Sequence, residues 1–190
     1  MDDIDVSIRV GEKIRAFRDS LGLSLGDLAE KTGFSTAYLS QVENHLISPP
    51  LGALMKIARC LDIETGKLFD QKGTAPFTIV KSDERVPTSR VASKEGVRYG
   101  YSYESLAPDK INRKMEPFLV TLEPASKKGT PYNHEGEEFL FVLEGRVEIQ
   151  LGEYTDILEP GDSVYYDSTL HHRVSCVGGE PARIIAVIHS

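Results

Sequence analysis

The spacing of the apolar residues changes once along the chain, near residue 70. Before that point they recur at helical intervals, as in the stripe Val10, Ile14 and Phe17, and such a stripe is typical of an amphipathic helix with one buried face. Glycine and serine interrupt the pattern where one helix would end and the next would be capped. This part of the sequence predicts four helices and a short fifth.

Beyond residue 76 the apolar residues alternate with polar ones instead. Short runs rich in β-branched and aromatic residues follow one another, separated by Gly, Pro and Asp, with no helical pattern between them, which is typical of a β-barrel or sandwich. We therefore expect an α plus β protein with more than one domain: a helical domain over residues 1–71, a linker over 72–76 and a β-domain over 77–190. The runs are FTIV, YGYSY, FLVTL, FLFVL, VEIQL, SVYY and RIIAVI.

Composition narrows the classes of protein that fit this layout. The 190 residues carry a formal net charge of -7, and the helical domain has eight Lys and Arg against eleven Asp and Glu. This balance argues against binding of nucleic acid by bulk charge, although it leaves a local docking face possible. The sequence has no apolar run long enough for a membrane span and no leader pattern, so we expect a cytoplasmic protein without a membrane partner. Cys60 and Cys176 lie in different predicted domains, which makes a disulfide framework improbable.

Residues 23–63 pair a short helix, a glycine-containing turn and a second helix, the geometry that lets one helix enter the major groove. This stretch resembles the five-helix, lambda-repressor-like DNA-binding domain of the phage-repressor and XRE-type regulators. The resemblance implies a partner in double-stranded operator DNA. The matching positions are Leu28 and Ala29, Gly33, Ser35, Val42 to Asn44, and Pro49.

By this resemblance the recognition helix runs from about Ser35 to His45. Gln41 can form a bidentate pair with adenine, Thr36 can bond to more than one base, and Ala37 can touch a thymine methyl group. A solvated helix face would carry the same residue types, so the chemistry permits base readout without requiring it. The residues expected to face DNA are Ser35, Thr36, Ala37, Tyr38, Ser40, Gln41 and Asn44.

Two further features of the helical domain matter to this hypothesis. Arg18 and Glu43 align with a family pair that joins the first helix to the recognition helix, so we interpret them as scaffold. Leu25 stands where the family often has a glutamine that touches the DNA backbone, which counts against DNA binding. Helix N-termini and backbone N–H groups also hold phosphate, so few basic side chains are needed.

The β-domain contains two segments with a regular histidine spacing. In the first, His134 is followed after three residues by Glu138 and after six more by Gly145; in the second, ten residues separate Gly161 from His172. These segments resemble the two motifs of the cupin family, whose fold is a double-stranded β-helix or jelly-roll barrel. The resemblance covers roughly residues 77–190.

The cupin resemblance also implies a metal site, with one ligand fewer than the family usually has. Tyr132 stands where the family has a further histidine, so His134, Glu138 and His172 remain as three ligands. Two imidazoles and one carboxylate form the facial-triad set, which leaves open positions on a divalent metal such as Fe(II), Zn, Ni or Mn. The alternative is a sensor barrel with no metal, in which His134 is an ordinary cavity histidine.

Alternation along the strands orients several other side chains. His171 and His172 must point to opposite faces of their strand, and the register favours His172 as the residue inside the barrel. Tyr101 and Tyr103 share one strand face with Tyr99, where they either line a ligand cavity or pack the barrel. Tyr132 is a further cavity candidate.

Two functions fit the combined layout. It resembles the bacterial XRE-cupin transcriptional regulators, which implies a homodimer whose barrel binds a small-molecule effector and shifts operator affinity by linkage. It also resembles hydroxypropylphosphonate epoxidase, which implies a mononuclear non-haem iron oxygenase with a helical domain that does not bind DNA and with Tyr103 or Tyr101 near the metal. The exposed residues of the recognition helix favour the regulator.

Overall fold

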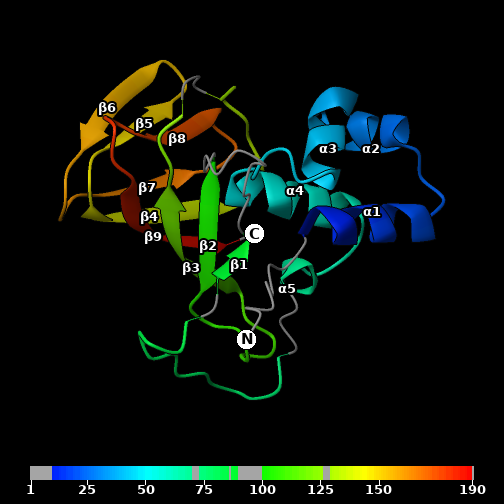
Figure 1. Cartoon of the computed structure of the whole chain (residues 1–190), viewed down its shortest axis with the longest axis horizontal. Helices are drawn as coiled ribbons and strands as arrows, with labels where there is room; N and C mark the ends of the chain where they lie inside the picture. The colour runs from blue at the N-terminus through cyan, green and yellow to red at the C-terminus, as the bar shows by residue number, and fades with distance from the viewer. Residues whose placement is uncertain (1–9, 70–72, 86, 90–99, 126–128, 190) are drawn as a thin grey trace, which may run out of the picture.

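Five helices form the N-terminal part of the protein, here called the head, and they lie to one side of the β-strands (Figure 1). The computed structural model describes residues 10–69, 73–85, 87–89, 100–125 and 129–189. None of the described helices has the length and apolar character needed to cross a membrane. The helices are α1 (Val10–Ser20), α2 (Leu25–Thr32), α3 (Thr36–Glu43), α4 (Leu51–Cys60) and α5 (Thr65–Leu68).

Side-chain caps begin α2 and α3 where the serines of the sequence predict them. Ser24 Oγ accepts a hydrogen bond from the backbone N–H of Asp27, whose carboxylate accepts in return from the backbone of Ser24. This reciprocal pair is a capping box, which satisfies two of the amides left open at a helix start. Ser35 caps α3 by accepting from the backbone N–H of Tyr38 at 3.1 Å. Gly33 ends α2 at a φ of 72°, a conformation that glycine adopts without strain.

The head has an apolar core crossed by one ion pair. Ile14, Leu28 and Leu39 are fully buried between the helices. Arg18 Nε donates to Glu43 Oε1 at 2.7 Å, and its second terminal nitrogen donates to Glu43 Oε2 at 2.9 Å. The bidentate pair ties α1 to α3, as the resemblance to the repressor family implies.

Nine described strands form two sheets, here called the barrel. One sheet has the order β1-β2-β3-β9-β4-β7 and the other β6-β5-β8. Paired neighbours run antiparallel, and β9 joins β3 to β4 along its whole length. The five helices followed by two antiparallel sheets confirm the expected α plus β fold. The strands are β1 (Pro87–Ser89), β2 (Tyr101–Ser105), β3 (Met115–Leu122), β4 (Glu137–Glu144), β5 (Val147–Leu151), β6 (Tyr154–Leu158), β7 (Ser163–Asp167), β8 (His172–Cys176) and β9 (Ala182–His189).

One predicted strand does not form. Residues 77–80, the FTIV run, are irregular, and Phe77 and Ile79 are 67% and 76% exposed. Nearby, Ala75 makes only an isolated bridge to Lys110, so this segment has no ladder to join. A strand needs such a partner, because an unpaired β-segment leaves its backbone to water. The proposed linker stays a prediction, since residues 70–72 lie outside the described ranges, as does Tyr99.

The head packs against the barrel through the segment that leads into α4 and through α4 itself (Figure 1). Ser48 Oγ donates to the carbonyl of Tyr101 at 2.6 Å, and the hydroxyl of Tyr103 donates to the carbonyl of Pro49 at 2.5 Å. Two contacts further along α4 extend this interface. They are the 3.1 Å bond from Lys56 Nζ to the carbonyl of Asn133 and the 2.5 Å ion pair of Arg59 with Glu135.

Candidate functional site

The three residues predicted as metal ligands come together inside the barrel. His134 lies just before β4, Glu138 lies on β4, and His172 begins β8 of the other sheet. Their exposed fractions are 7%, 4% and 0%, and one ligand atom from each lies within 4.8 Å of the others. This cluster, here called the triad, is assembled from the two segments that the cupin spacing identified.

Backbone carbonyls orient both imidazoles of the triad. Nδ1 of His134 is 2.9 Å from the carbonyl of Glu135, and Nδ1 of His172 is 2.8 Å from the carbonyl of Leu170. A carbonyl only accepts, so each Nδ1 must carry the hydrogen. In the neutral ring the lone pair is then on Nε2, which is the arrangement found in metal-ligating histidines.

Glu138 is held by two neighbours. Its Oε1 lies 2.9 Å from Nε2 of His134, and its Oε2 accepts a hydrogen bond from the hydroxyl of Tyr166. Tyr166 pairs directly with Glu138 across β4 and β7, so their side chains share a face. Burial, with a contribution from Glu138, holds the pKa of Tyr166 well above its usual value, which keeps the phenol a donor. The alternation in "SVYYD" indicates that one of its two tyrosines faces inward, but it does not show that Glu138 is the carboxylate to which this tyrosine donates.

The triad has an unfilled bonding capacity that suits a cation. Nε2 of His172 is buried and has no hydrogen-bond partner among the described residues. Burial lowers the pKa of His172, which favours the neutral ring that a metal needs. Nε2 of His134 and the carboxylate of Glu138 also face each other at 2.9 Å, a contact that requires a proton or a cation. A divalent metal fits this donor set.

The tyrosines proposed for a ligand cavity have different surroundings. Tyr132 lies beside the triad, with its ring centroid 4.6 Å from that of His172. Tyr101 stacks on Tyr103 at 6.2 Å, and its hydroxyl donates to the carbonyl of Val174. Backbone carbonyls accept hydrogen bonds from the hydroxyls of both Tyr101 and Tyr103, and the two rings line, together with Tyr132, a small cavity that borders Glu138.

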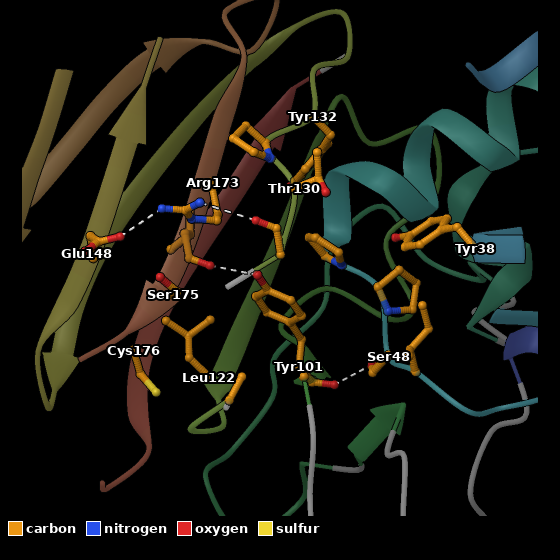
Figure 2. A pocket seen from close by; sticks show the side chains of 18 of the residues that line it. Tyr38, Ser48, Tyr101, Leu122, Thr130, Tyr132, Glu148, Arg173, Ser175 and Cys176 are labelled. Atoms are coloured by element: carbon orange, nitrogen blue, oxygen red, sulfur yellow. Dashed lines mark hydrogen bonds and ion pairs between the residues drawn. The ribbon is translucent and has the colours of Figure 1, made fainter. Parts of the chain in front are cut away.

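A cleft of about 900 Å³ lies between the head and the edge of β8 (Figure 2). Tyr38 forms part of its wall on the head side, while Tyr101, Arg173 and Ser175 line it from the barrel. Nε of Arg173 and Oγ of Ser175 are buried without a partner among the described residues, although another guanidinium nitrogen pairs with Glu148 at 3.0 Å. Sequence reasoning missed Arg173 and Ser175, because both are outward residues of a strand whose motif histidine faces inward.

The expected DNA-facing residues divide into two groups. Ser35, Thr36, Ala37, Gln41 and Asn44 are exposed, and Ser40 is half-buried. Asn44 is held in position by a 2.7 Å bond from Arg15. These side chains leave one face of α3 open to solvent.

Tyr38, also expected to face DNA, is half-buried in the structure. Its ring packs 5.0 Å from that of Phe34 and lines the cleft. Burial raises the pKa of its hydroxyl. The reason is register: Tyr38 lies on the side of α3 that faces this cleft. His171, in contrast, is exposed while His172 is buried, as strand alternation predicted.

Comparisons with known families and proteins agree with this two-part structure. A helix-turn-helix family profile matches residues 14–68, and a cupin-domain profile matches residues 118–188. The chain is similar to the HTH-type transcriptional regulator PuuR of Escherichia coli (strain K12), with 23% identity over 184 residues, 96% of this chain and 95% of the relative. It is 38% identical over 89 residues to the HTH-type transcriptional regulator SinR of Bacillus subtilis (strain 168), covering 46% of this chain and 80% of that relative.

Solved structures share the same layout. An HTH_3 family transcriptional regulator from Vibrio cholerae has a TM-score of 0.60 at 22% identity, over 96% of this chain and 95% of that one. The iron(II) form of HppE has a TM-score of 0.50 at 24% identity, over 95% of this chain and 98% of that one. At these identities the similarity establishes the fold and no activity.

Proposed function

Because the chain belongs to the helix-turn-helix transcriptional regulators and carries a C-terminal cupin domain, we propose that it binds operator DNA through α3 and responds to a ligand of its barrel. The observation that carries this proposal is the solvent-exposed face of α3. The barrel adds a buried triad and a cleft, either of which can hold a ligand.

Recognition of DNA bases by α3 would rest on three exposed side chains. Gln41 supplies the amide that pairs with adenine, Thr36 a hydroxyl, and Ala37 a methyl group for thymine. Ser35 begins α3, so the free amides of its first turn point towards a phosphate when the helix enters the groove. The head therefore does not depend on a positive net charge.

The triad supports a divalent metal. His134 and His172 would supply Nε2, Glu138 would supply Oε1, and Tyr166 would hold the second carboxylate oxygen. Fe(II), Zn, Ni and Mn all accept this donor set, and each would supply Lewis acidity at open positions. In a regulator such a metal serves to bind or sense rather than to turn over substrate.

The cleft supports a small-molecule effector with hydrogen-bond acceptors. Arg173 and Ser175 line it with a guanidinium and a hydroxyl, although Nε of Arg173 and Oγ of Ser175 are themselves buried. Tyr101 and Tyr132 add aromatic surface, which suits a ligand with a flat apolar part and a carbonyl or carboxylate. Tyr38 belongs to α3, so a ligand here would touch the recognition helix directly.

A homodimer completes the proposal. Regulators of this class read two half-sites about one helical turn apart, and two copies of α3 are needed for that spacing. An effector that favours one arrangement of the two heads would change operator affinity by the difference in its own affinity for the two arrangements.

A second candidate is a mononuclear iron oxygenase. The triad favours it, because two histidines and a carboxylate leave open positions for substrate and oxygen. The space beside Glu138 counts against it: the cavity there, lined in part by Pro50, Leu51 and Gly52, has a volume of only about 30 Å³. A cavity of this size does not hold an organic substrate.

One experiment separates the two functions. Purified protein is tested by electrophoretic shift and footprinting on its own upstream region, and the same sample is analysed for metal. A footprint of two half-sites that Gln41→Ala weakens about 5- to 150-fold, as expected for loss of a bidentate base contact, supports the regulator. Glu30→Ala, at an exposed position of α2, is the control. Absence of any specific shift, with substrate-dependent oxygen uptake, favours the oxygenase.

A further inference from the structure

The outer face of the larger sheet is apolar along its centre. On β4 and β9 every second side chain points into the barrel core, as Leu140 and Ala186 do, and the residues between them point outward. The outward apolar residues are partly or largely exposed, and none of them is part of the apolar core that the described residues form. They are Phe139, Phe141 and Leu143 of β4, Ile185 and Val187 of β9, and Tyr165 of β7.

Strand register joins these six side chains into one continuous surface, here called the outer patch. Phe139 lies opposite Tyr165 on β7 and opposite Val187 on β9. Phe141 lies opposite Ile185. Side chains in directly opposite positions of an antiparallel pair have Cβ atoms about 4.5–5.5 Å apart, so these rows are in contact. An antiparallel sheet whose outer face meets water normally carries polar residues there, so an apolar row indicates that something covers it.

Charged side chains flank the outer patch at its ends. Glu137 and Asp167, which are paired across β4 and β7, lie at one end, and Arg183 of β9 lies at the other. An apolar, partly aromatic centre with a charged rim is the usual composition of a protein interface. A second copy turned end for end would bring its two carboxylates towards Arg183, whose own exposed pair with Glu144 contributes little. The outer patch is therefore complementary to itself.

The sheet is also large enough for such an interface. β3, β4 and β9 have eight residues each, and β7 has five. Strands lie about 4.8 Å apart and rise about 3.3 Å per residue, so these four strands present roughly 450 Å² of flat surface per copy. Two copies would cover about 900 Å² of flat surface, and their accessible surface is larger because side chains stand above the sheet. This area reaches the approximately 1,000 Å² that a specific interface needs.

We propose that two copies of this chain pair through the outer patch, sheet against sheet. The inference rests on the proposed function and names the surface that its homodimer uses. Hydrogen bonds of the head go to Tyr101, Tyr103 and Asn133, which leaves the outer patch open to a second copy. Since head and barrel share one apolar core, pairing of the barrels would fix the distance between the two copies of α3.

A charge in the centre of the outer patch tests the proposal. Phe141→Lys places an ammonium on the apolar face and leaves the inward core residues unchanged. We expect it to weaken pairing at least about 100-fold, because the charge would lose its water in the interface. Ile157→Lys, at a position of β6 in the smaller sheet that is 46% exposed, is the control and should pair like the unchanged chain. Sedimentation equilibrium without DNA measures the pairing, and circular dichroism checks the fold.

A second measurement uses the unchanged chain. Tyr165 on the outer patch and Tyr154 on β6 are 64% and 61% exposed in the single chain, and each hydroxyl donates to a carboxylate on its own sheet. Hydroxyl radicals should therefore oxidise the two rings at similar rates in a monomer. In the dimer Tyr165 should react severalfold more slowly than Tyr154. If Phe141→Lys does not fold, these two rates decide the question.

Three results would overturn the proposal. The first is a chain that stays monomeric, which would also remove the homodimer from the proposed function. The second is a dimer that persists in Phe141→Lys, and the third is a dimer in which Tyr165 and Tyr154 react at similar rates. Either of these last two would leave the homodimer in place and assign it to another face. No operator DNA is present in these measurements, so failure of DNA binding would be seen separately.

Discussion

The head and the barrel each bury a cluster of titratable side chains, and the two clusters differ in how completely they are satisfied. In the head, Arg18 donates to both oxygens of Glu43, to Asp19 and to the carbonyl of Leu23. In the barrel, Nε2 of His172 has no partner among the described residues. Burial is similar in both places, so burial alone does not identify a site.

The two clusters differ in how many of their hydrogen-bonding groups have partners, and this difference indicates different roles for the two clusters. A buried charge that is fully paired stabilises one arrangement of its neighbours and has nothing left to offer a ligand. A buried imidazole with an unused lone pair is costly to keep unless something binds it. We therefore interpret the pair of Arg18 and Glu43 as scaffold and the triad as a binding site.

The largest expected effect comes from breaking the saturated cluster. Glu43→Ala leaves the guanidinium of Arg18 buried without its partner, which should destabilise the head by about 3–5 kcal/mol. Urea unfolding followed by helical circular dichroism measures the loss. Glu144→Ala removes the partner of Arg183 in an exposed pair and should change stability by less than about 1 kcal/mol. Equal effects of the two substitutions would remove the distinction between the clusters.

Removal of a triad ligand should affect binding and not folding. His172→Ala is expected to reduce Zn²⁺ affinity by at least about 100-fold, because metal affinity depends on ligand number. The strands and their ladders hold the barrel, so its thermal unfolding should remain cooperative. His171→Ala, which changes the exposed neighbouring ring, is the control for both measurements. Unfolding of His172→Ala, with wild-type folding of the control, would make His172 a structural residue like Arg18.

A smaller effect is expected from the residue that orients the carboxylate. Tyr166→Phe deletes the hydroxyl that donates to Glu138, and loss of such an outer hydrogen bond weakens metal binding about 10- to 100-fold. Tyr165→Phe makes the same chemical change on the opposite face of β7, where the hydroxyl donates to Glu137. Zn²⁺ competition on both variants distinguishes a local effect on the triad from a general effect on the strand. Equal affinities would show that Tyr166 has no part in metal binding.

The sequence predicted those parts of the two clusters that depend on local spacing. Helical periodicity and serine caps identified the head, and the resemblance to the two cupin motifs identified the triad, because each of these signals lies within a short segment. Tyr166 and Gly52 were not found, since they meet the triad only after β7 pairs with β4 and α4 docks on the barrel. Contacts between distant segments depend on packing that no single segment encodes.

The orientation of Tyr38 shows the same limit within one helix. Its neighbours Thr36 and Ala37 are exposed as predicted, but Tyr38 is half-buried and lines the cleft between head and barrel. The resemblance to a DNA-binding family describes an isolated head and contains no barrel.

The smallest expected effect concerns the exposed cap of α2, where the carboxylate of Asp27 has hydrogen-bond partners but is not buried. Ser24→Ala removes the side-chain half of the capping box of α2 and should cost about 1 kcal/mol. Hydrogen bonds from the Ser24 side chain and backbone lower the pKa of Asp27. A carboxyl whose pKa is lower in the folded state stabilises the fold above its unfolded pKa, and this contribution is lost as the pH falls through the folded value.

Ser24→Ala should therefore raise the pKa of Asp27, which NMR titration of the carboxyl would measure. The stability of the head should then fall less steeply as the pH is lowered, which thermal melts at several pH values would measure. Ser20→Ala, which removes only a bond to the carbonyl of Phe17, should leave that pKa unchanged. If Ser24→Ala destabilised the head as much as Glu43→Ala, burial would not explain why a core ion pair contributes more to stability than an exposed cap. The contrast between head and barrel would then have to rest on the unused lone pair of His172 alone.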